Sequence, residues 1–91
     1  MNDPQDKDAR ILAMVEEFID VANRLKNSGE AVPTINTALM LASATYSTYL
    51  AAGNDGYLKE GGIRKVSRAY EENLKRVQEI KKATLNPDGA D

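Results

Sequence analysis

Residues 31–54 carry no charged side chain, although 29% of the chain's 91 residues are Asp, Glu, Lys or Arg. From Pro33 to Gly53 this stretch consists mainly of alanine, hydroxyl and apolar residues. A solvated helix normally keeps polar and charged residues on one face, so a helix without charges needs cover on most sides. The stretch therefore predicts a helix that is surrounded either by protein or by lipid.

We expect protein, and not lipid, to surround this helix. The stretch is long enough to span a membrane, but bulky aliphatic residues are few and its flanks lack the Lys and Arg clusters that set membrane topology. Eight of its positions are Thr, Ser or Asn, namely Thr34, Asn36, Thr37, Ser43, Thr45, Ser47, Thr48 and Asn54. We therefore expect a soluble, buried helix and no membrane span.

The composition favours a small intracellular domain that associates with other chains. Ninety-one residues make one domain near the lower size limit for an independent core. One Phe and no Trp leave few large apolar side chains, which favours oligomerisation. The absence of Cys suits a reducing compartment, and the acidic, polar residues 1–8 do not resemble a signal peptide. We expect a cytoplasmic protein.

The first helix is predicted over residues 4–27. Asp3 is a suitable N-cap and Pro4 suits the first turn, while Gly29 is a suitable left-handed cap at the end. Apolar residues recur every three or four positions, at Ile11, Val15, Phe18, Ala22 and Leu25. This pattern predicts an amphipathic helix with a coiled-coil-like seam.

The second helix is predicted over residues 34–52, beginning just after Pro33 and ending at Gly53. It carries two stripes at helical spacing. One stripe is Ile35, Leu39, Ala42, Tyr46 and Tyr49, and the other, mostly of small residues, is Ala38, Leu41, Thr45, Thr48 and Ala52. Two usable faces allow this helix to pack against two neighbours, and small side chains permit a close approach.

The third helix is predicted over residues 63–83, preceded by one unstable turn at residues 57–60. Gly61 and Gly62 weaken any helix that includes them by about 2 kcal/mol in total relative to alanine. Residues 86–91 are expected to form a flexible tail, leaving residues 1–85 as a single helical domain.

These elements predict an all-α fold, a three-helix up-down-up bundle in which the charge-free middle helix is the most buried. Three helices of this size cannot cover the middle helix on every side, so we expect the bundle to assemble as a homodimer or a higher oligomer. The candidate interface residues are Ala38, Leu41, Ala42, Thr45, Tyr46, Thr48 and Tyr49.

The sequence contains no recognisable set of catalytic residues. The chain has no His, the most frequent general base and metal ligand. Glu16, Glu17 and Asp20 are typical of a solvated helix face, and Ser43 and Ser47 lack an activating base. The turn glycines do not form a phosphate-binding loop, which needs a Gly-x-x-x-x-Gly-Lys-Ser/Thr motif after a strand. We expect no catalytic, cofactor or metal site and no enzymatic activity.

The third helix offers an alternative function. Residues 57–83 hold eight Lys or Arg against four Glu, a local charge of +4. A basic helix can contact phosphates, here through Arg64, Lys65, Arg68, Lys75 and Arg76. The net charge of −2 and the interspersed Glu residues count against nucleic-acid binding. Weak nucleic-acid binding remains the alternative to a non-enzymatic interaction module whose partner is its own copy or an unidentified protein.

Two segments resemble a known family. Residues 17–23 read Glu-Phe-Ile-Asp-Val-Ala-Asn and residues 38–44 read Ala-Leu-Met-Leu-Ala-Ser-Ala, followed by Tyr46 and Tyr49. Over residues 14–80 the chain resembles domain-of-unknown-function family 3144, which implies a short, all-helical proteobacterial protein and supplies no activity. Where that family has Ala-Arg-Phe-Asn-Ala-Phe, residues 44–49 read Ala-Thr-Tyr-Ser-Thr-Tyr. The aromatic spacing is kept, and the arginine and asparagine are replaced.

Overall fold

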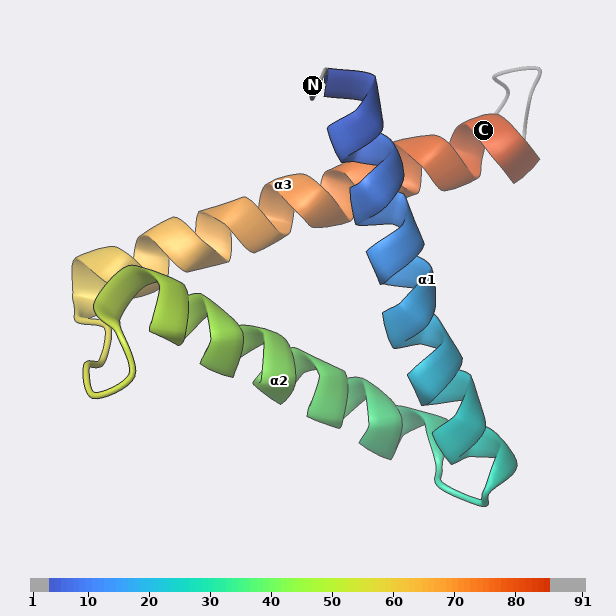
Figure 1. Cartoon of the computed structure of the whole chain (residues 1–91), viewed down its shortest axis with the longest axis horizontal. Helices are drawn as coiled ribbons and strands as arrows, with labels where there is room; N and C mark the ends of the chain where they lie inside the picture. Colours follow the sequence, from blue (N-terminus) through green and yellow to red (C-terminus); the bar gives the residue numbers. More distant parts are fainter. Residues whose placement is uncertain (1–3, 86–91) are drawn as a thin grey trace. The chain divides into compact units, whose positions relative to one another are not determined.

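The computed structural model of the chain describes residues 4–85 and consists of three helices (Figure 1). These are α1 (Pro4–Asn27), α2 (Val32–Ala52) and α3 (Glu60–Leu85). No strand occurs within residues 4–85, so the all-α prediction is confirmed. Asp3 and the expected tail at residues 86–91 lie outside the described residues.

The helices are distributed over two compact units, Met1–Ala44 and Thr45–Asp91. The first unit contains α1 and the first part of α2, and the second contains the rest of α2 and all of α3. Each unit is therefore a helical hairpin with its own turn.

The turn of the first unit begins at a glycine cap. Gly29 adopts a positive φ of 112°. Its amide donates to the carbonyl of Lys26 at 3.0 Å, and the amide of Glu30 donates to the carbonyl of Leu25 at 3.1 Å. This pair of bonds is the Schellman arrangement, which satisfies carbonyls that the helix end leaves open. The predicted role of Gly29 is confirmed, and α1 has the bounds expected from the sequence.

Helix α2 begins two residues earlier than expected, at Val32. The amide of Ile35 donates to the carbonyl of Ala31 at 3.0 Å, which closes the first helical turn around Pro33. Proline fits within a first turn because amides there have no partner inside the helix. The expectation that the helix starts only beyond Pro33 is wrong for this reason.

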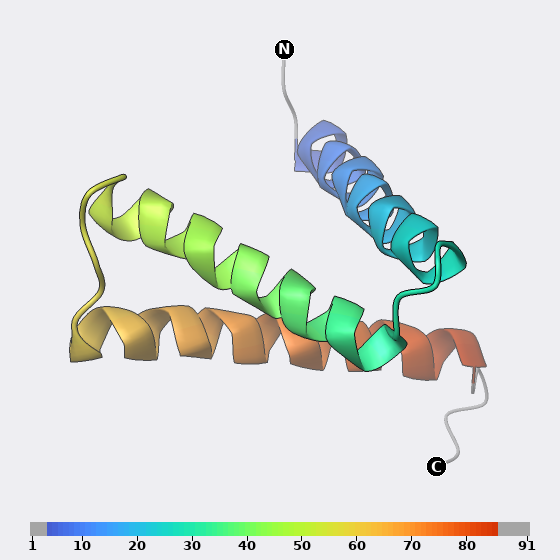
Figure 2. The same ribbon diagram turned by 90° about the horizontal axis from the view of Figure 1, so that it is seen from below.

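The turn of the second unit starts at Gly53, which has a φ of 80°. The amide of Gly53 donates to the carbonyl of Tyr49 at 2.9 Å, and the amide of Gly56 donates to that of Gly53 at 3.3 Å. Figures 1 and 2 show the end of α2 and the start of α3 on either side of this turn. The end of α2 at Ala52 and the turn chemistry at residues 53–56 match the sequence prediction.

Helix α3 begins at Glu60 and includes both glycines, so the expectation of a firm start at Ile63 is wrong. The amide of Ile63 donates to the carbonyl of Lys59 at 2.9 Å, which places the first turn over the glycines. The Leu58 side chain contacts Gly62, and both residues are half-buried. Leu58 precedes Gly62 by four residues, so this contact is local to the start of α3.

Burial is sparse in both units. Ile35 on α2 is 7% exposed and is the one buried side chain among those described. Most other side chains of α2 are exposed within the described residues. Each unit supplies a single neighbouring helix to its part of α2.

Candidate interaction surface

Helix α1 presents a broad apolar face that its own unit leaves uncovered. Eight large apolar side chains of α1 are each between 42% and 65% exposed, namely Ile11, Leu12, Met14, Val15, Phe18, Ile19, Val21 and Leu25. Ala22, in the middle of the predicted seam, is half-buried. Helical periodicity brings these residues to one side, so they form a contiguous surface suited to packing.

The first part of α2 adds apolar residues to the same unit. Leu39 is 37% exposed, Met40 52% and Leu41 64%. The predicted interface residues Ala38 and Ala42 are exposed as well. These side chains are accessible within their unit, as an interface with another chain requires.

The hydroxyl group of Thr37 does not prevent burial of its part of α2. The Thr37 hydroxyl donates to the carbonyl of Pro33 at 3.1 Å, one helical turn earlier. Such bonds satisfy a hydroxyl inside its own helix. A threonine bonded in this way can be covered by protein without the cost of an unsatisfied polar group.

In the second unit, two tyrosines close to the end of α2 contact each other. The rings of Tyr46 and Tyr49 pack edge to face, with centroids 6.3 Å apart and ring planes at 71°. Tyr46 is 76% exposed and Leu50, one turn further on, is 88% exposed. Leu50 is absent from the interface residues predicted from the sequence. Its position four residues after Tyr46 is the signal that could have identified it.

Thr48 differs from the other predicted interface residues. It is half-buried, as are Ala52 at the end of α2 and Leu58, Gly62 and Val66 around the start of α3. These residues surround the turn of the second unit, where the two helix ends lie next to each other. Within this unit, Thr45 stays exposed and Thr48 is partly used by the hairpin.

The apolar stripe of α3 is half exposed on both sides of Val66. Ile63, Tyr70, Leu74, Val77 and Ile80 are between 46% and 55% exposed. Their spacing of three, four or seven residues keeps them on one side of the helix. The second unit therefore has an open apolar face of its own.

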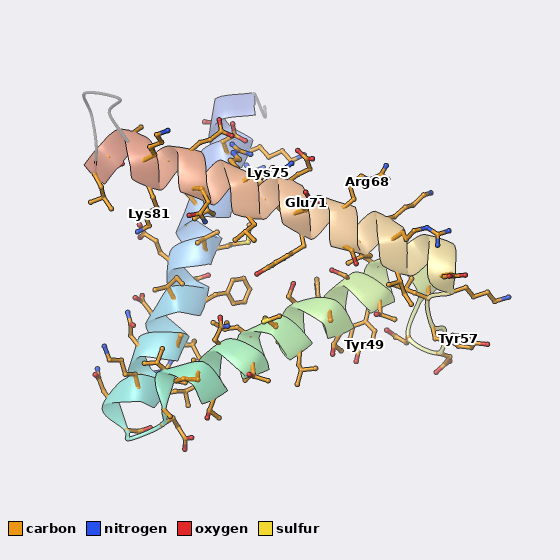
Figure 3. All side chains as sticks on the ribbon, turned by 180° about the vertical axis from the view of Figure 1, so that it is seen from behind. Tyr49, Tyr57, Arg68, Glu71, Lys75 and Lys81 are labelled. Carbon is orange, nitrogen blue, oxygen red and sulfur yellow. The ribbon has the colours of Figure 1, made fainter. Side chains whose placement is uncertain are left out.

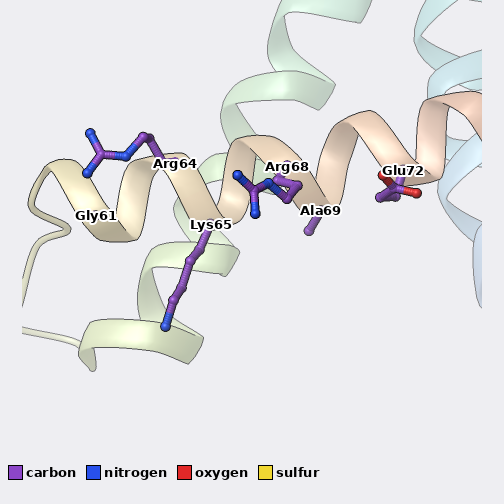
Figure 4. Close-up of a pocket in the computed structure, with 6 residues that line it drawn as sticks. All are labelled: Gly61, Arg64, Lys65, Arg68, Ala69 and Glu72. Carbon is purple, nitrogen blue, oxygen red and sulfur yellow. The ribbon is translucent and has the colours of Figure 1, made fainter.

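The basic residues occupy the other side of α3. Arg64, Lys65 and Arg68, with Gly61, Ala69 and Glu72, line a shallow hollow on this helix (Figure 4). Arg68 stands two residues from both Val66 and Tyr70, and a two-residue step turns a helix by about 200°. The basic side and the apolar stripe can therefore meet different partners.

Two of the predicted phosphate-contacting residues are already paired with Glu. Arg64 lies 3.6 Å from Glu60 and Lys75 lies 3.3 Å from Glu71, measured between side-chain nitrogen and oxygen. Figure 3 shows Arg68, Glu71 and Lys75 extending outward along α3. Lys65, Arg68 and Arg76 have no ion pair within the described part of the chain. Three of the five candidates are thus available for an external anion.

Among residues 4–85, Glu16, Glu17 and Asp20 belong to no group of three or more acidic side chains arranged to hold a metal ion. The three acids remain on the polar side of α1 as exposed residues. The described helices also include none that is long and apolar enough to cross a membrane.

The fold and these surfaces define a small helical protein with open apolar faces, and the sequence comparison supplies its family. The chain belongs to the family described as "Protein of unknown function (DUF3144)", which matches residues 11–76. The match runs from the apolar face of α1 through α2 to the basic side of α3, and it confirms the resemblance seen in the sequence. No curated protein and no solved structure matches the chain.

Proposed function

We propose that this protein is a non-enzymatic interaction module that first assembles with copies of itself. The observation that supports the proposal is the exposure of large apolar side chains on all three helices, with Ile35 as the one buried side chain described. Full burial of one such side chain contributes about 1.5–3 kcal/mol. Because a native domain is stable by only about 5–15 kcal/mol, the uncovered faces represent a large part of the stability that this chain can reach.

A second copy is the simplest protein that could cover these faces. Most soluble oligomers are homo-oligomers, and a two-fold dimer repeats each contact twice. The exposed residues Ala38 and Thr45 on α2 are small, which permits close approach of another helix. A bacterial, cytoplasmic setting belongs to the same proposal, and the lack of Cys is compatible with it.

The non-enzymatic part of the proposal rests on the chemistry available to the chain. Without His, acid–base catalysis would need carboxyl, Lys or Tyr groups with shifted pKa values. Ser43 and Ser47 have no Ser-x-x-Lys motif or other base on their helix, as nucleophilic activation requires. Binding rather than turnover is the activity that exposed apolar helix faces support.

Co-expression of two differently tagged copies tests self-assembly. We expect both copies to be recovered together when one tag is used for purification at physiological salt. A matched control mixes the two copies only after separate purification, which reports whether subunits exchange. Recovery of a single species in both experiments would contradict the proposal.

Nucleic-acid binding is the second candidate, favoured by the hollow lined by Arg64, Lys65 and Arg68. Glu72 lies in the same hollow, and Glu60 and Glu71 compete with phosphate for two of the basic residues. Such a site would bind weakly and without base readout, because phosphate contacts carry no sequence information. Its binding would decrease steeply with salt concentration.

A further inference from the structure

We draw no further inference here: the strongest candidate, the pair of half-exposed apolar faces on α1 and α3, carries nothing because nothing in the structure shows whether the same chain or another molecule covers them.

Discussion

The side chain of Leu58 lies over Gly62, so that a Cβ added at Gly62 would stand 3.1 Å from Cδ2 of Leu58. The neighbouring Gly61 has no atom within 4 Å of the same position. The two glycines thus share a helix but differ in their surroundings, and they form a matched pair for mutation.

The variant G61A should increase the free energy of unfolding by about 1 kcal/mol, since alanine is the better helix former by that amount. The variant G62A should give less than half of that gain, because Leu58 has to move. Urea unfolding at one fixed protein concentration compares the two variants with the wild type. A gain at Gly62 equal to that at Gly61 would show that Leu58 does not pack there.

Gly53 gives a second prediction, at the end of α2. Its φ of 80° lies in the left-handed region, which costs other L-residues about 1–2 kcal/mol. We expect G53A to lower the free energy of unfolding by about 1 kcal/mol. The control G53N should lose less, because Asn tolerates this conformation. Equal losses in thermal or urea unfolding would argue against the turn as described.

The exposed positions Ala38 and Thr45 test the role of α2 in assembly. Replacing either residue with Arg puts a long, charged side chain on a surface that we expect to be covered by another subunit. Each variant should shift the protein toward monomer in light scattering while circular dichroism shows unchanged helix content. The control N54R adds the same charge in the exposed turn and should leave assembly intact. Loss of assembly in all three variants would implicate net charge instead of this surface.

The basic side of α3 should not be a tight DNA site. Because Arg64 and Lys75 are paired with Glu residues, phosphate would have to compete with carboxylates for two of the five candidate cations. We expect duplex binding at about 0.15 M salt to be no tighter than non-specific binding, with a Kd of roughly 10⁻⁴–10⁻⁶ M. Fluorescence anisotropy with the wild type and with R68E measures this. Submicromolar binding that R68E abolishes would reverse the order of the two candidate functions.

The helices were predictable because local signals define them. The four-three spacing from Ile11 to Leu25, the glycine cap at Gly29 and the turn at Gly53 all act within a few residues of chain. The start of α3 was not predictable from propensity, since both low-propensity glycines lie within its first turn. The start of α2 required recognition that Pro33 fits inside a first turn, where its missing amide has no consequence.

The exposed surface of α2 could be predicted only in part from the sequence. The absence of charge over residues 31–54 indicated that α2 needs a partner, and the exposure of Leu41 and Tyr46 is compatible with that reading. The sequence pattern could not show that Thr48 is half-buried, because its burial depends on how the hairpin closes. The exposure of Leu50 was also not predicted. An uncharged helix has no polar side, so its sequence does not show which of its faces is exposed.

Light scattering of the wild-type protein tests the central claim most directly. The chain has a mass of 10.0 kDa, and the measurement covers low to high micromolar concentrations at physiological salt. Self-assembly predicts a mass of at least twice that value at high micromolar concentration, decreasing on dilution if the complex is reversible. A mass of one chain at every concentration would contradict the account.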